Sequence, residues 1–181
     1  LYGLSPDPAV ASAADLSLIP ALTLRAPLTS VKVIEEGSPV SYGGTWAAPT
    51  RRWIGLVPLG YGDGILRASS NRARVLVHTA SGPLSAPVVG RVCMDQFMID
   101  LGEAAGGAGE ATAHAGQPPA RVGDDAILLG NGAGGEPLAD EWADAADTIN
   151  YEIVTRLGAH IPRTYVRSGA ERTQHGRNPH D

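Results

Sequence analysis

Cysteine and lysine are each present once in this 181-residue chain. With Cys93 as the single thiol, no intramolecular disulfide can form, and a thiol outside any Cys/His cluster offers no zinc site. Of the 14 basic residues, Lys32 is the one primary amine of a side chain, and the rest are arginines. We therefore expect a protein of the reducing cytoplasm that needs no metal.

Long apolar runs and basic clusters are also missing. The unbroken apolar stretches are far shorter than the roughly 20 residues of a transmembrane helix, and no basic start precedes a signal-like segment. Acidic residues exceed basic ones, which gives a formal net charge of -5. Binding to nucleic acid or to anionic lipid requires a cluster of basic residues, which this sequence lacks. We therefore expect a soluble protein that binds neither.

Glycine and proline are abundant, with 23 and 14 residues, and they divide the chain into short elements. Short runs rich in β-branched or aromatic residues predict strands. The predicted strands are 21–36, 40–46, 53–59, 73–79, 85–91, 92–101, 125–129 and 161–166. Two helices are predicted at 137–143 and at 148–157, the second with Thr148 as N-cap and Gly158 as its end. The fold class is mainly β, a small barrel- or sandwich-like domain with two short helices near the C-terminus.

The spacing Gly130-x-Gly132-x-x-Gly135 matches the dinucleotide fingerprint and lies between a predicted strand and a helix. The fingerprint requires a second parallel strand, whereas two acidic helices follow here. Eight acidic and no basic side chains lie between Arg121 and Arg156, a field that repels a diphosphate. A glycine-rich connection is the favoured interpretation of this segment, and 102–120 is read as a surface loop.

Two further motifs have both a structural and a chemical interpretation. Gly60-Tyr61-Gly62-Asp63-Gly64 follows an apolar run, so it is either a hairpin turn with a packed ring or a turn that displays a phenol for acid/base work. In the segment 90–100, Met98 and Ile99 read as core residues, while Arg91 and Asp95, four apart on one strand face, could line a charged entrance. Tyr151, early in a helix, is either one more packed aromatic or a functional residue.

Together, five segments in this order resemble the C-terminal half of alanine racemase, a pyridoxal-phosphate enzyme. They are Leu1-Tyr2-Gly3-Leu4-Ser5-Pro6, Val40-Ser41-Tyr42-Gly43, Val57-Pro58-Leu59-Gly60-Tyr61-Gly62-Asp63-Gly64, Gly90-Arg91-Val92-Cys93-Met94-Asp95-Gln96 and Thr148-Ile149-Asn150-Tyr151-Glu152. The resemblance implies a β domain over 20–166, preceded by the end of a (β/α)8 barrel and a linker over 1–19. Residues 167–181 are predicted to be a disordered tail.

The resemblance also implies the chemistry. In this family two subunits form a homodimer, and each site joins one subunit's barrel to the partner's β domain, to interconvert L- and D-alanine for peptidoglycan. Tyr61 resembles the catalytic tyrosine base, Met94 the residue whose backbone amide holds the substrate carboxylate, and Tyr151 the tyrosine that reaches the cofactor phosphate. Arg91, Asp95 and Ile149 resemble residues of the entrance.

Several family features have no counterpart in this sequence. The lysine that forms the Schiff base with pyridoxal phosphate belongs to the barrel and lies outside this chain, and Lys32, between Val31 and Val33, is predicted to face solvent. Gly62 stands where alanine is more usual. We therefore expect the chain alone to be inactive, and a non-catalytic β module for interaction is the alternative function.

Overall fold

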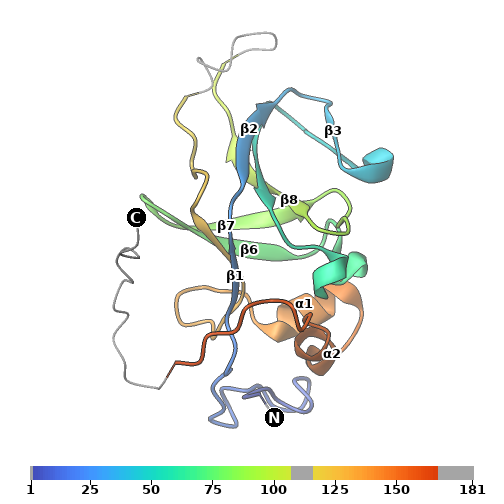
Figure 1. Ribbon diagram of the computed structural model, residues 1–181, viewed down its shortest axis with the longest axis vertical. Coiled ribbons are helices and arrows are strands. Elements are labelled where there is room, and N and C mark those ends of the chain that lie inside the picture. Colours follow the sequence, from blue (N-terminus) through green and yellow to red (C-terminus); the bar gives the residue numbers. More distant parts are fainter. Residues whose placement is uncertain (1, 107–115, 167–181) are drawn as a thin grey trace, which may run out of the picture.

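The structure is a computed structural model, and it describes residues 2–106 and 116–166. Seven strands form one antiparallel sheet in the order β1-β9-β6-β7-β8-β5-β2, and β3 and β4 form a separate small sheet (Figure 1). The elements are β1 (Leu24–Pro27), β2 (Ser30–Ile34), β3 (Pro39–Val40), η1 (Tyr42–Gly44), β4 (Trp46–Ala47), β5 (Arg52–Val57), η2 (Tyr61–Asp63), η3 (Arg67–Ser69), β6 (Arg74–Thr79), β7 (Gly82–Val89), β8 (Phe97–Glu103), β9 (Asp125–Leu129), α1 (Ala139–Ala146) and α2 (Asn150–Thr155).

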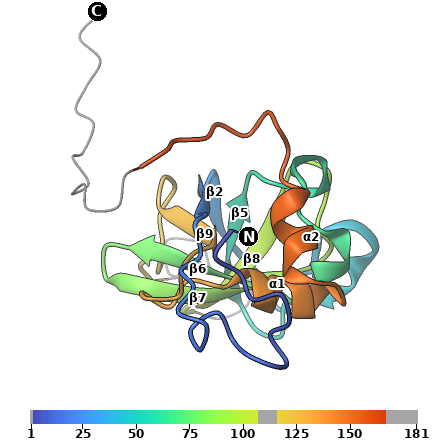
Figure 2. The same cartoon turned by 90° about the horizontal axis from the view of Figure 1, so that it is seen from below.

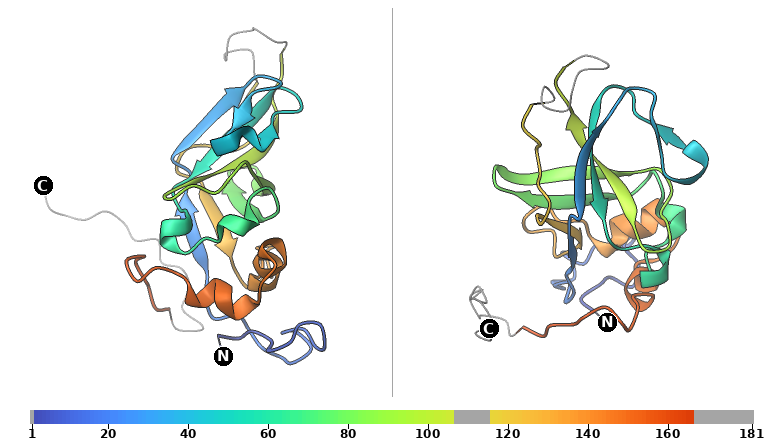
Figure 3. Two further views of the ribbon diagram at one scale, coloured as in Figure 1. Left: turned by 90° about the vertical axis from the view of Figure 1, so that its right-hand side faces the viewer. Right: turned by 45° about the horizontal axis from the view of Figure 1, so that its top comes forward.

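The large sheet is curled into a half-barrel, as the two views of Figure 3 show. Strands β1 and β2 follow each other in the chain but stand at opposite ends of the strand order. Between them, the Leu28 N–H donates to the Asp124 carbonyl at 2.9 Å, and the Thr29 N–H donates to the Leu56 carbonyl at 3.0 Å. Two adjacent residues thus bond to segments on the β9 side and the β5 side of the sheet.

The core lies inside the curl and is closed at one end by α1 and α2 (Figure 2). Alternate residues of the strands are fully buried, among them Val75 and Val77 of β6. From α1, Trp142 packs edge-on against Phe97 of β8, with ring centroids 6.3 Å apart and an interplanar angle of 67°. The helices therefore belong to the same core as the sheet.

The mainly β class and the two short helices near the C-terminus are confirmed. The predicted strand over 21–36 is instead two strands, because the backbone changes partner at residues 28–29, where the Leu28 N–H bonds to Asp124 and the Thr29 N–H to Leu56. The predicted strand over 92–101 begins only at Phe97, since residues 90–96 form a connection. No strand forms over 161–166.

The helix boundaries differ from the prediction by a few residues. Helix α1 begins at Ala139 rather than at 137, and α2 begins at Asn150, with Ile149 rather than Thr148 at the N-cap. The Thr148 hydroxyl donates to the Glu152 carboxylate instead of capping the backbone. The predicted tail over 167–181 and residues 107–115 of the predicted loop lie outside the described residues.

The glycine-rich segment 130–135 lies in an antiparallel setting, since β9 pairs antiparallel with both β1 and β6. The Gly134 N–H donates to the Glu136 carboxylate at 2.8 Å, and the Gly130 N–H donates to the Pro137 carbonyl at 2.9 Å. These bonds make the segment a compact connection into α1, as the favoured interpretation had it. Across residues 2–106 and 116–166, no helix has the length and apolar character needed to cross a membrane.

Candidate functional site

Two connections pack against each other, backbone to backbone: the Tyr61 loop (residues 60–64) and the Met94 loop (residues 90–96). The Tyr61 N–H donates to the Cys93 carbonyl and the Gly62 N–H to the Met94 carbonyl, both at 2.9 Å. A Cβ at Gly60 would lie 2.2 Å from the Met94 carbonyl oxygen, so this approach requires glycine. At Gly62, a Cβ would lie 3.5 Å from the Met94 side chain and 3.7 Å from the Asp95 carboxylate. The structure thus brings Tyr61, Met94 and Asp95 together.

The Tyr61 loop is also held from its other side. Asp63 accepts the Gly60 N–H at 2.7 Å through Oδ2, and its Oδ1 lies 2.8 Å from His160 Nε2. The Asp63 carbonyl accepts the Gly158 N–H at 2.9 Å. The interpretation of this motif as a hairpin turn is wrong, because β5 pairs with β2 and β8 and not with β6. The loop instead leads through η2 and η3, and it leaves Tyr61 48% exposed.

The Met94 loop is fixed by the residues that precede β6. The Gly90 N–H donates to the Asn71 side chain at 2.6 Å, and the Val92 N–H to the Ser70 hydroxyl at 3.0 Å. Met94 is 54% exposed, and its N–H has no acceptor within the described part of the chain. The prediction that Arg91 and Asp95 share one face of a strand is wrong, because both lie in this connection.

A third segment, the Tyr42 turn (residues 41–44), leans on the Met94 loop. The Ser41 hydroxyl donates to the Arg91 carbonyl at 2.7 Å and lies 3.2 Å from the Cys93 sulfur. The Arg91 guanidinium lies against the turn, since a Cβ at Gly43 would be 3.4 Å from Arg91 Nε. Arg91 Nε is buried and has no hydrogen-bond partner within residues 2–106 and 116–166. Tyr42 itself is 74% exposed.

Sequence reasoning used the Tyr42 segment for the resemblance but gave Tyr42 no role. One signal was available, because the tyrosine is followed by two glycines, which adopt positive φ angles of 74° and 54°. A tyrosine on such a turn is displayed rather than packed. The contact between Gly43 and Arg91, 48 residues further along the chain, could only be seen in the fold.

Helix α2 presents the last two predicted residues. Ile149 is 64% exposed at the N-cap, whereas Tyr151 is half-buried and packs against the core. The hydrogen bond from the Thr148 hydroxyl lowers the pKa of Glu152 below its usual range, and Arg156 acts in the same direction. Beyond the other end of α2, Gly64 of the Tyr61 loop approaches the Arg156 carbonyl closely. Ile149 and Tyr151 therefore lie on a helix whose far end supports the Tyr61 loop.

The hydrogen-bond donors on these loops suit contacts to an anionic group whose covalent attachment lies outside this chain. The Met94 N–H and Arg91 Nε are donors without acceptors in the described residues, and the hydroxyls of Tyr42 and Tyr61 are on exposed turns. Lys32 is exposed on β2, as predicted, where it lies opposite Ile54 in the register. The residues present therefore fit contacts to pyridoxal phosphate, but not a covalent attachment to it.

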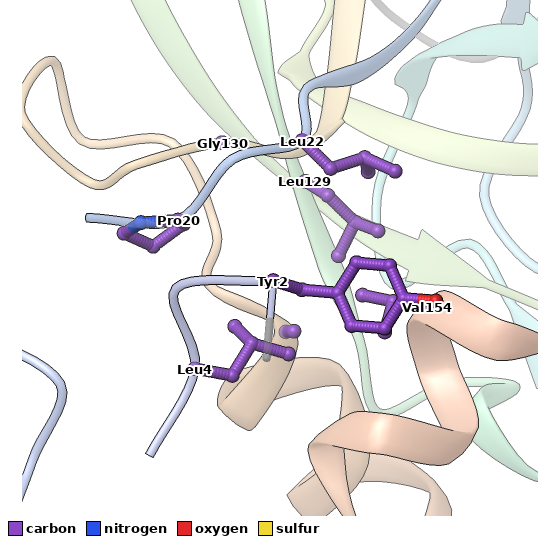
Figure 4. A pocket seen from close by; sticks show the side chains of 8 residues that line it. Tyr2, Leu4, Pro20, Leu22, Leu129, Gly130 and Val154 are labelled. Carbon is purple, nitrogen blue, oxygen red and sulfur yellow. The ribbon is translucent and has the colours of Figure 1, made fainter. Parts of the chain in front are cut away.

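The chain also has a small apolar pocket that no residue of these loops lines (Figure 4). It is formed where the N-terminal segment meets β9, α1 and α2, and none of the predicted site residues lines it. The lining residues are Tyr2, Leu4, Pro20, Leu22, Leu129, Gly130, Ala139 and Val154. The predicted site residues are instead carried mostly on exposed loops.

Comparison with known proteins gives one consistent family. Residues 21–165 match the model of the alanine racemase C-terminal domain. Alanine racemase from Mycolicibacterium smegmatis is 43% identical over 171 residues, which cover 94% of this chain and 39% of that protein. The crystal structure of alanine racemase from a D-cycloserine-producing Streptomyces lavendulae superposes with a TM-score of 0.78 at 43% identity, over 92% of this chain and 39% of the other.

A second structure, alanine racemase from Streptomyces coelicolor, gives a TM-score of 0.76 at 45% identity, over 91% of this chain and 38% of the other. The chain spans about two-fifths of the length of the curated relatives it matches, over their C-terminal portion. Sequence, fold and the order of the loop motifs agree. The chain therefore belongs to the alanine racemase family, within which it corresponds to the C-terminal domain.

Proposed function

We propose that this chain is the C-terminal part of a cytoplasmic, pyridoxal-phosphate-dependent alanine racemase, which supplies D-alanine for peptidoglycan. Its exposed loops complete an active site whose cofactor-binding barrel belongs to the other subunit of a homodimer. The observation that carries this proposal is the Met94 loop. It presents a main-chain donor that has no acceptor among the described residues, beside a tyrosine whose loop is held by backbone bonds.

The chemistry assigns a task to each element. Racemisation removes the α-proton from one face of alanine and returns a proton to the other, so one acid/base group must stand on each side. The cofactor, when bound, stabilises the negative charge left at the α-carbon. From this chain a tyrosine hydroxyl serves one face, and the Met94 N–H donates a hydrogen bond to the substrate carboxylate. Tyr151 reaches the cofactor phosphate, while Arg91, Asp95 and Ile149 line the entrance.

Two tyrosines can supply the hydroxyl. Tyr61 is the one predicted from the sequence, and its loop is bonded to the Met94 loop through two backbone hydrogen bonds. Tyr42 is the second candidate, because it is 74% exposed on a turn that the Ser41 hydroxyl bonds to the same Met94 loop. Tyr61 is the proposed base, and the experiment below distinguishes it from Tyr42.

A chimera tests this function. This chain replaces the matching C-terminal part of the Streptomyces coelicolor alanine racemase, and α-proton exchange into each alanine enantiomer is followed in deuterium oxide. The wild-type chimera is expected to bind pyridoxal phosphate and to racemise alanine. Replacing the base tyrosine by phenylalanine keeps the ring, so exchange into L-alanine should fall on the order of 10²–10⁴-fold while exchange into D-alanine persists.

The variant that shows this lopsided loss, Tyr42→Phe or Tyr61→Phe, identifies the base. Equal residual exchange into both enantiomers in both variants would remove tyrosine as the base. A folded wild-type chimera that binds cofactor but never racemises alanine would favour the non-catalytic β module instead.

A further inference from the structure

One side chain connects the N-terminal segment to the helix that carries Ile149 and Tyr151. Asn150 lies between them in the sequence and is only 3% exposed. Its amide Nδ2 donates to the Ser5 carbonyl at 2.9 Å and to the Asp140 carboxylate at 2.6 Å. Both protons of the amide are therefore used, one toward α1 and one toward a residue 145 positions earlier in the chain.

The N-terminal segment is docked at this point rather than lying loosely on the surface. Leu4 and Ser5 are buried, and the Ser5 hydroxyl donates to the Ala11 carbonyl at 2.6 Å. Figure 4 shows Leu4 and Tyr2 beside Val154 of α2, and the Ala21 N–H closes the segment with a bond to the Tyr2 carbonyl at 3.0 Å. The segment and α2 thus share one apolar contact and one buried polar contact.

Besides Asn150, the first turn of α2 is held by the packing of Tyr151 on the core and by the bonds of the Glu152 carboxylate to Thr148 and Arg156. Its N-cap residue, Ile149, offers no side-chain hydrogen bond to the helix, and the side chains of Ile149 and Tyr151 are exposed and half-buried. A buried amide bonded to a carboxylate and a carbonyl is a strong constraint, because a lost partner would leave buried polar groups without a hydrogen bond. The position of the turn is thereby set by Ser5 and Asp140 together.

We propose that Asn150 is a positioning residue that couples the N-terminal segment to the orientation of Ile149 and Tyr151. Only the consequence of this coupling rests on the proposed function. In the enzyme, docking of residues 2–5 would set how Tyr151 meets the cofactor phosphate and how Ile149 lines the entrance. The coupling itself concerns only this chain.

The first test uses the 181-residue chain and amide hydrogen exchange. Asn150→Asp removes both donors and sets two carboxyl groups against each other. Adding Asp140→Asn restores a hydrogen bond between positions 140 and 150 but leaves the Ser5 carbonyl without its donor. In this double variant the amides of Asp7, Ala11 and Ala21 should exchange about tenfold faster than in Asp140→Asn alone, while the sheet amides are unchanged. Equal exchange rates in the double variant and in Asp140→Asn would overturn the coupling.

Asp144→Asn is the matched control, because it removes a carboxylate from the exposed face of α1 without touching Asn150. It is expected to exchange like the wild type. If it instead loosens the N-terminal segment as much as the double variant does, charge on α1 rather than Asn150 sets the docking, and the proposal is wrong.

The second test measures cofactor affinity and steady-state kinetics in the chimera, at a temperature where all variants are folded. The double variant should show a Kd for pyridoxal phosphate about tenfold above that of Asp140→Asn. A loss of stability alone would not raise the Kd, because all variants are folded at this temperature. An unchanged Kd would overturn the positioning role. Failure of the wild-type chimera to bind the cofactor would count against the proposed function, whereas the exchange experiment still decides the coupling.

Discussion

The Tyr42 turn and the Tyr61 loop both present a tyrosine next to glycine, yet the protein holds them in different ways. The Tyr61 loop lies between two supports, the Met94 loop on one side and the segment after α2 on the other. The Tyr42 turn connects the two short strands β3 and β4, and the Ser41 hydroxyl bonds it to the Met94 loop. The comparison separates a loop that backbone hydrogen bonds hold on both sides from a turn that is held mainly by side chains.

This difference suits different tasks. A loop whose backbone is bonded on both sides fixes where its tyrosine starts and so helps to define the shape of a site, because the loop cannot move without breaking several hydrogen bonds at once. A more exposed ring on a turn with positive φ angles can adjust to a substrate and to a partner subunit. The Met94 loop lies against both segments, so a change in it should reach both tyrosines.

The largest expected effect comes from filling the contact beneath Tyr61. In Gly60→Ala the new Cβ would lie 2.2 Å from the Met94 carbonyl oxygen and 2.3 Å from that of Cys93, so backbone must move. We expect a loss of about 3 kcal/mol or more in the free energy of unfolding, measured by urea denaturation. Gly43→Ala is the counterpart in the Tyr42 turn, where the cost is the positive φ of 74°, about 1 kcal/mol. Equal losses in the two variants would remove the distinction between the segments.

The side chains that hold each segment give a smaller difference. Asp63→Ala removes the acceptor of the Gly60 N–H and the partner of His160, so we expect a loss of about 1–3 kcal/mol. Ser41→Ala removes one hydroxyl bond to the Arg91 carbonyl and should lose about 0.5–1.5 kcal/mol. Thermal unfolding of the two variants under the same conditions checks the order. A larger loss in Ser41→Ala would mean that the Tyr42 turn is the better anchored segment.

The smallest effect is a pH dependence at the Arg72–Asp147 pair, which joins the segment before β6 to the end of α1. Arg72 bonds to Asp147 through both guanidinium NH groups, and these bonds lower the pKa of Asp147 below its usual range. The folded-state pKa is thus below the unfolded one, so the pair stabilises the fold above the unfolded pKa of about 3.9, and this contribution is lost as the pH falls through the folded value. In Arg72→Gln the acid-induced loss of stability should be shallower below about pH 4, as followed by circular dichroism. An unchanged acid transition would show that the pair contributes nothing there.

Much of the fold follows from local sequence. Short runs of apolar and β-branched residues predict strands β5, β6 and β9, and in the structure each of these runs is buried over consecutive residues. The break between β1 and β2 at residues 28–29 and the start of β8 at Phe97 were missed for a common reason. Both depend on hydrogen bonds to distant segments, at Leu56 and Asp124 in one case and at Ser70 and Asn71 in the other.

The candidate site likewise has one part that the sequence predicts and another part that depends on distant contacts. The glycine-rich motif around Tyr61 predicts a tight turn with a close backbone approach. The structure shows that approach at position 60, where a Cβ would meet the Met94 carbonyl oxygen. The surroundings of the Tyr42 turn cannot be predicted from the sequence. Arg91 belongs to another connection, and it contacts Gly43 only when β7 and β8 are in place. The roles of Tyr61, Met94, Tyr151, Arg91, Asp95 and Ile149 remain predictions.

The link between β1 and β2 has a consequence for cooperativity. Leu28 exchanges hydrogen bonds with residues 123 and 124, and Thr29 bonds to β5, so two neighbouring residues join the two ends of the strand order. Neither end of the sheet can open on its own without pulling on a residue bonded to the other end. We therefore expect the half-barrel to lack a weakly stable terminal strand, and its first and last strands to be lost in one transition rather than by fraying from an edge.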